Sequence, residues 1–177
     1  MERKIKRDLY ISVPLMFLIG AVFHFVFEWF GSVFFIAPFF PVNESIWEHT
    51  KLAVFPLLLF YSIYYKLFKN KNLIDRDSWF SALLIAILTS VLTMIITYYT
   101  YVGIFGKDNT FVNICILLFS LFVGQIMAKR YYDLKKRIPF KCVIYTLTIV
   151  FILYTVLTFY PCKIPLFYDF NANKYSY

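Results

Sequence analysis

Five long apolar stretches constrain the fold of this chain more than any other feature. A helix that crosses about 30 Å of hydrocarbon at 1.5 Å per residue needs roughly 20 residues. Each stretch reaches membrane-spanning length, so we expect an all-α, polytopic bundle of five transmembrane helices that forms a single integral membrane domain over residues 1–177. The predicted spans are residues 10–29, 46–67, 79–102, 111–127 and 142–160.

Composition excludes the other broad classes. Apolar and aromatic residues make up 61% of the chain and charged residues 16%, against about 45–50% and about 25% in soluble domains. An aromatic content of 23% excludes disorder. The three cysteines form no close pair, so we expect neither a disulfide framework nor a zinc ribbon. The net charge is +8. The positively charged residues lie between the apolar runs, which favours the lipid bilayer over nucleic acid as a partner.

Positively charged residues collect on one side of the predicted bundle. Fourteen lie in the N-terminal segment and in the loops after the second and fourth spans, and four lie on the other side. Such residues favour the cytoplasmic side of a membrane, so we expect the N-terminus inside and the C-terminus outside. The alternative is a six-span chain in which residues 32–41 re-enter the membrane. No internal repeat is present, which weighs against inverted-repeat transporters.

Histidine and glutamate residues gather at the predicted outer face. His24 and Glu28 lie four residues apart near the end of the first span, and Glu44, Glu48 and His49 lie around the start of the second. His24 lies about 8 Å inside the span, where an ionisable group usually faces a bundle interior or a cavity. A short outer turn makes the two spans antiparallel neighbours. We therefore expect these side chains to converge in one outward-opening pocket.

This set of side chains predicts three kinds of role. Imidazole nitrogens and carboxylate oxygens are ordinary zinc ligands, so a divalent metal could be held by His24, Glu28, Glu44, Glu48 and His49. The groups could instead act as catalytic acids and bases whose pKa values burial separates; the candidates are His24, Glu28, Glu48 and His49. They could also cancel charge in a polar network without chemistry.

A purely structural interpretation explains part of the same segment. Residues 45–48 have the S-x-x-E pattern of a helix capping box. Lys51 can pair with Glu48 or Glu44, and Trp47 is typical of an anchor at the membrane interface. His24 and Glu28 are left unexplained, so the hypothesis of a site depends most on them.

Two further features bear on the outer face. Pro56 lies inside the second span and has no N–H group, so it leaves the carbonyl of Leu52 without its donor four residues on and should bend the helix. The tail after residue 160 is too apolar to extend into water. We expect it to fold back over the outer mouth of the bundle and to bring Asp169 near the cluster.

Two segments resemble an uncharacterised family of small, five-span membrane proteins from Firmicutes-type bacteria. The first is residues 41–52, PVNESIWEHTKL, preceded by His24-x-x-x-Glu28-Trp29. The second is the tail Ile164-Pro-Leu-Phe-x-Asp169, in which Phe170 stands where the family tends to have proline. The resemblance implies a multi-pass protein of the bacterial cytoplasmic membrane and brings no known activity.

Three functions remain open at this point. The first is a membrane hydrolase or transferase that acts on a lipid or small molecule at the outer face with a metal or acid–base centre. The second is a binding or transport component for a cation or a proton-coupled substrate. The third is an accessory structural protein in which the cluster is a buried polar lock. The absence of a serine or cysteine nucleophile motif and of H-E-x-x-H weakens the first.

Overall fold

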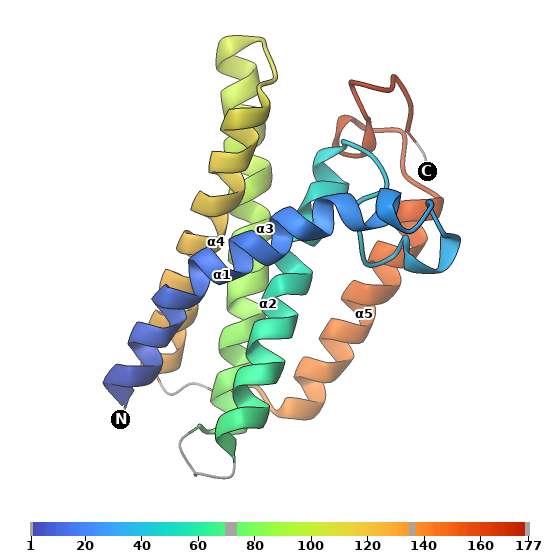
Figure 1. The fold of residues 1–177 in the computed structure, drawn as a ribbon. Helices are drawn as coiled ribbons and strands as arrows, with labels where there is room; N and C mark the ends of the chain where they lie inside the picture. The colour runs from blue at the N-terminus through green and yellow to red at the C-terminus, as the bar shows by residue number, and fades with distance from the viewer. Residues whose placement is uncertain (1, 70–73, 135–136, 176–177) are drawn as a thin grey trace.

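A computed structural model describes residues 2–69, 74–134 and 137–175 (Figure 1). Within these residues the regular structure is helical apart from one isolated bridge between Asp169 and Lys174. All five long helices have the length and the apolar character needed to cross a membrane, which confirms the all-α, five-span class. The helices are α1 (Glu2–Trp29), α2 (Ile46–Phe68), α3 (Arg76–Phe105), α4 (Thr110–Asp133) and α5 (Phe140–Phe159), with 3-10 turns η1 (Phe34–Ile36) and η3 (Pro165–Phe167).

Capping side chains set where several helices begin. Asp75 accepts a hydrogen bond from the backbone N–H of Ser78 at 2.9 Å, so α3 starts before the apolar run that predicted it. Asn109 caps α4 in the same way, through Phe111 and Val112. Such caps satisfy amides that a helix leaves without an internal partner. The helices are consequently longer than most of the predicted spans.

The connection between α1 and α2 contains only the three-residue turn η1, so the alternative with a sixth, re-entrant span is not what the structure shows. The orientation of the termini stays a prediction. Three of the lysines behind it, Lys71, Lys135 and Lys136, lie outside the described residues. The cysteines at positions 115, 142 and 162 are free and exposed.

Helices α3 and α4 form a long antiparallel pair, and α1 crosses the bundle diagonally in front of them (Figure 1). Small residues allow the α3–α4 approach: a Cβ on Gly124 would come within 2.9 Å of the Ala86 carbonyl oxygen. Near the opposite end of α2 the fully buried Trp79 packs on Tyr61, with ring centroids 4.5 Å apart. The end of α1, the start of α2 and the C-terminal tail meet at one end of the bundle (Figure 1).

Candidate functional site

A structured turn ahead of α2 positions the central acidic residue of the site. The Asn43 side chain accepts a hydrogen bond from the Ser45 amide at 2.9 Å, an Asx turn of the kind that often precedes helices. The Ser45 hydroxyl then caps α2 by accepting the Glu48 N–H at 3.4 Å. Glu44 lies between these two residues, so both sides of its backbone are held in place.

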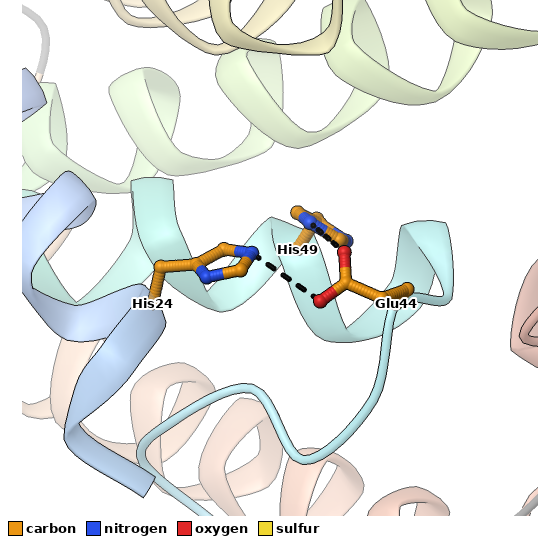
Figure 2. Close-up of side chains that lie close together, drawn as sticks. All are labelled: His24, Glu44 and His49. Carbon is orange, nitrogen blue, oxygen red and sulfur yellow. Dashed lines mark ion pairs between the residues drawn. The ribbon is translucent and has the colours of Figure 1, made fainter. Parts of the chain in front are cut away.

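Glu44 bridges the two histidines (Figure 2). Its Oε1 lies 3.5 Å from His24 Nε2 on α1, and its Oε2 lies 3.4 Å from His49 Nε2 on α2. The imidazole rings approach each other, with centroids 5.3 Å apart. Three side chains from two helices and their connection therefore converge on one point.

A backbone hydrogen bond fixes the orientation of His49. Its Nδ1 lies 2.9 Å from the carbonyl oxygen of Ser45. A carbonyl only accepts, so Nδ1 carries the proton and Nε2 presents its lone pair to the site in the neutral ring. A lone pair facing a carboxylate oxygen needs a cation between them, either a second proton or a metal. The backbone carbonyl thus acts as the outer partner that metal-binding histidines usually have.

The spacing of these three side chains suits a tetrahedral metal. One ligand atom from each residue can be chosen so that all lie within 4.8 Å of one another. Two ligands at 2.0–2.1 Å from a tetrahedral zinc lie about 3.3 Å apart, and each histidine nitrogen lies 3.4 or 3.5 Å from a different oxygen of the Glu44 carboxylate. Two imidazoles and one carboxylate are also the donor set of several zinc hydrolases, in which the fourth position stays open.

The Glu44 carboxyl is ionised in this arrangement. Hydrogen bonds from His24 first, and then from His49, hold its pKa far below the usual range, although partial burial opposes this. A carboxylate rather than a carboxylic acid therefore faces the imidazoles over the ordinary pH range. Metal binding requires this form, because a protonated carboxyl is a poor ligand.

The C-terminal tail holds the Glu44 backbone from the other side. Asp169 is buried, and its Oδ2 accepts the Glu44 N–H at 3.0 Å. Its Oδ1 accepts the amides of Asn171 and Ala172. Phe167 packs on Trp47 with ring centroids 5.1 Å apart. The tail thus folds back over this end of the bundle, as its apolar sequence predicts, and Asp169 positions Glu44 without joining the group of side chains that could hold a metal.

Glu48 does not join the histidines, although the sequence predicts that it lies in one cluster with them. It is buried and forms an ion pair with the fully buried Lys51. Its Oε1 accepts a hydrogen bond from the hydroxyl of Thr158 on α5. Its Oε2, which pairs with Lys51, also accepts a hydrogen bond from the Val42 amide at 3.1 Å. Only half of the capping box forms, because the Glu48 side chain reaches Val42 rather than Ser45. Glu48 therefore belongs to a separate lock that ties α2 to α5.

Glu28 is likewise apart from the histidines. Its side chain is exposed one turn beyond His24, and it is not in the group that can hold a metal. The reason is the diagonal course of α1 (Figure 1). A face of a crossing helix stays in contact with its neighbour only near the crossing point, so the next turn along the same face has already left it.

The three side chains border a cavity of about 580 Å³ between α1, α2, α3 and α4. Its lining is mainly apolar, with further polar groups near the cluster end, among them Tyr98, Asp108 and Asn113. The sequence did not point to these residues of α3, α4 and the connection between them. Their one signal is that they are polar residues at the ends of apolar runs that lie on the same side of the predicted membrane as His24.

The fold and the site define a class: a small multi-pass helical membrane protein with a His–Glu–His cluster at one end of its bundle. The chain belongs to the family of unknown function DUF6512, whose model matches residues 1–177. No curated protein and no solved structure matches the chain. The whole-chain match agrees with the resemblance to an uncharacterised membrane family.

Proposed function

We propose that the protein is a metal-dependent membrane hydrolase whose metal, zinc by its ligand chemistry, is held by His24, Glu44 and His49. The observation that carries this proposal is the convergence of two imidazole nitrogens and one carboxylate, all within 4.8 Å of one another, on the border of a cavity. When bound, the metal supplies a Lewis acid that polarises a substrate oxygen and acidifies water. Three protein ligands leave one position for these roles.

The residues around the metal site have distinct tasks in this proposal. His49 is held in one tautomer by the Ser45 carbonyl, and Glu44 is held by Asp169 through its amide. His24 comes from another helix and closes the set. Preorganised ligands of this kind bind a metal without a large loss of conformational freedom.

The arrangement favours this function over a purely structural lock. The chain already contains such a lock in Lys51 and Glu48. Both side chains are almost completely buried, and the Lys51 ammonium pairs with Glu48 and donates hydrogen bonds to the Ala37 carbonyl and the Thr158 hydroxyl. The His–Glu–His cluster is different, because His24 and Glu44 keep 30% and 43% of their side-chain surface exposed and face a cavity. We also place the site at the outer face of a bacterial cytoplasmic membrane, on the basis of the positive-inside asymmetry.

Metal binding to the purified protein tests the proposal. We expect one zinc per chain by elemental analysis after removal of loosely bound metal, and a loss of affinity of at least about 10–100-fold in H24A, E44Q and H49A. E28Q is the matched control, since Glu28 is an exposed carboxylate one turn from His24, and it should bind zinc like the unmodified protein. Equal zinc binding by E44Q and E28Q would contradict the site.

Hydrolysis is tested separately with a total bacterial lipid extract. The zinc-loaded protein is incubated with the extract, and the lipids are compared by mass spectrometry with those from an E44Q incubation. We expect at least one lipid species to be consumed only by the unmodified protein, with its hydrolysis products appearing in equal amount. If both incubations leave the same lipids, the protein binds metal without being a hydrolase of membrane lipids.

A further inference from the structure

On each of the four helices that line the cavity, a polar residue beside the cluster is followed by apolar residues further into the bundle. On α1 the polar His24 is followed towards the bundle centre by Ala21 and Phe17, and on α2 His49 is followed by Leu52. On α3 Tyr98 is followed by Met94, and on α4 Asn113 is followed by Leu117. Adjacent helices in such a bundle run in opposite directions, so these sequence steps all point the same way along the cavity.

This order gives the cavity a polar end and an apolar end. The apolar residues lie one to two helical turns, about 5–10 Å, further in than the polar ones. Met94 and Leu117 are buried, so the floor is enclosed. A volume of about 580 Å³ falls within the range of about 300–1,000 Å³ that is common for small-molecule sites. A ligand that fits must therefore be apolar along one part and polar at one end.

We propose that this cavity binds a single-chain amphiphile with an oxyanionic head, its head at His24, Glu44 and His49 and its chain along Phe17, Met94 and Leu117. This inference rests on the proposed function and names the substrate class of the same site. With a divalent metal, two neutral imidazoles and one carboxylate, the metal centre itself carries one net positive charge, while the exposed Asp108 carboxylate at the cavity border accepts a hydrogen bond from Asn113. A phosphate or carboxylate oxygen supplies the complementary charge and the missing metal ligand.

Asn113 provides a second, independent indication of a polar head. Its Nδ2 donates to Asp108 at 2.9 Å, whereas its Oδ1 is buried and has no hydrogen-bond partner within the described part of the chain. A buried acceptor without a donor is unfavourable, because it has lost its hydrogen bonds to water and gained none in return. A hydroxyl group on the head, next to the oxyanion, would satisfy it. Lysophosphatidic acid carries an apolar chain, a hydroxyl and a phosphate in this order.

The cavity also has a side on which such a molecule can enter. Phe25 of α1 and Ile114 of α4 both line the cavity and are both about half exposed. These two helices cross and then diverge towards this end of the bundle (Figure 1). An amphiphile already dissolved in the bilayer can therefore reach the floor with its chain without leaving the hydrocarbon.

Photolabelling in a bilayer tests the inference. Zinc-loaded protein in nanodiscs of zwitterionic lipid is exposed to a medium-chain lysophosphatidic acid that carries a diazirine at the end of its chain, and labelled residues are mapped by mass spectrometry. We expect labels on residues of the floor, above all Met94 and Leu117. Unlabelled lysophosphatidic acid should compete, whereas inorganic phosphate and an alkyltrimethylammonium ion should not.

Two neighbouring substitutions on α1 give a matched pair. Ala21 lines the cavity and Val22 is 49% exposed outside its lining. A21F should fill part of the cavity and lower floor labelling by about ten-fold or more, equivalent to a loss of at least 1.4 kcal/mol, while V22F should leave it unchanged. Zinc content is measured in the same samples, and both variants should keep it.

The outcomes separate the two proposals. If zinc binds but the labels spread evenly over lipid-facing residues such as Val22 and Leu118, the amphiphile inference is wrong and the metal site stands. If A21F and V22F label alike, the chain does not occupy this cavity, and the inference is again wrong. If zinc does not bind to the unmodified protein, the proposed function fails, and the inference that rests on it fails too.

Discussion

The carbonyl oxygen of Leu52 lies directly against Gly20: a Cβ atom added to Gly20 would come within 2.6 Å of that oxygen. Pro56 has no N–H group, so it cannot give this carbonyl its usual hydrogen bond four residues along α2. Because Gly20 has no side chain, α1 can approach closely the part of the α2 backbone where this carbonyl lacks its helical hydrogen bond. His24 lies one turn further along α1, so this contact sets the distance between the two histidine-bearing helices.

Replacing Gly20 by alanine should therefore disturb both stability and the site. The added methyl group forces α1 and α2 apart, which should lower the free energy of unfolding by about 1–3 kcal/mol and weaken zinc binding. Gly103 is the matched control, because an added Cβ there meets nothing within 4 Å. G103A should keep or raise stability, by up to about 1 kcal/mol, in thermal unfolding monitored in detergent. Equal effects of the two substitutions would contradict the close approach.

Breaking the buried lock should be costly. K51M leaves the Glu48 carboxylate buried without its counter-charge, which should lower the free energy of unfolding by about 3–5 kcal/mol. The exposed Lys66 of the same helix is the control, and K66M should change stability by less than about 0.5 kcal/mol. The double variant K51M/E48Q should recover part of the loss. Additive losses in the double variant would argue against a direct pair.

Asp169 should act on the metal through Glu44. The two oxygens of the Asp169 carboxylate accept hydrogen bonds from the Glu44 and Asn171 amides. D169N replaces one of these oxygens by an NH₂ group that cannot accept, so Glu44 is no longer held in a fixed position. We expect zinc affinity to fall by about 10–100-fold, measured by competition with a chromophoric chelator. Y168F changes the neighbouring tail residue, whose hydroxyl donates a hydrogen bond to Asn173 within the tail, and should bind zinc normally. A normal affinity in D169N would remove Asp169 from this role.

The metal-free protein should lose stability in acid through Glu44. The folded state holds the pKa of this carboxyl well below its usual value, which is about 4.3 in the unfolded chain. The folded state therefore binds fewer protons than the unfolded state. The contribution of the ionised Glu44 to the free energy of unfolding is present above about pH 4.3 and decreases as the pH falls below that value. The difference in melting temperature between the unmodified protein and E44Q, measured in a chelator, should shrink from pH 5 to pH 3. A constant difference would contradict this.

The orientation of the chain is open to a direct test. The asymmetry of positive residues predicts that a reporter fused after Arg137 is cytoplasmic and that one fused after Lys107 is external. Activity of a phosphatase reporter, which needs the external side, should appear only at Lys107. The reverse pattern would place the His–Glu–His cluster at the inner face and would change which leaflet supplies its ligand.

The sequence predicts the helices well and the site only in part. Five spans follow from the length of apolar runs, because the bilayer requires each run to form its own backbone hydrogen bonds. The position of His24 near the start of α2 also follows, because consecutive spans of a membrane bundle are antiparallel, so the end of α1 and the start of α2 lie on the same side of the membrane. Glu44 is among the predicted ligands, but its position between the two histidines could not be predicted in this way, because it lies in a turn, where no helical period fixes the direction of its side chain.

Glu28 and Glu48 show the limits of arguing from a shared helical face. Glu28 shares a face with His24, yet the crossing angle of α1 separates them in space, and no sequence period encodes that angle. Glu48 had a competing partner within one turn, Lys51, and burial of both made that pair the better one. The cavity depends on how four helices pack together, which sequence periodicity does not specify.

The hydrogen bond from Glu44 to Asp169 also has a consequence for the order in which the protein is made. The two residues are 125 positions apart, and Asp169 follows all five spans. At a synthesis rate of about 5–20 residues per second, the residue that clamps Glu44 leaves the ribosome roughly 6–25 s after Glu44 itself. During that interval both histidines and Glu44 have been made, but the turn that carries Glu44 lacks its clamp. If the cluster holds a metal as proposed, full affinity arises only after the fifth helix has been synthesised, and a chain cut before Asp169 retains every span yet lacks the clamp.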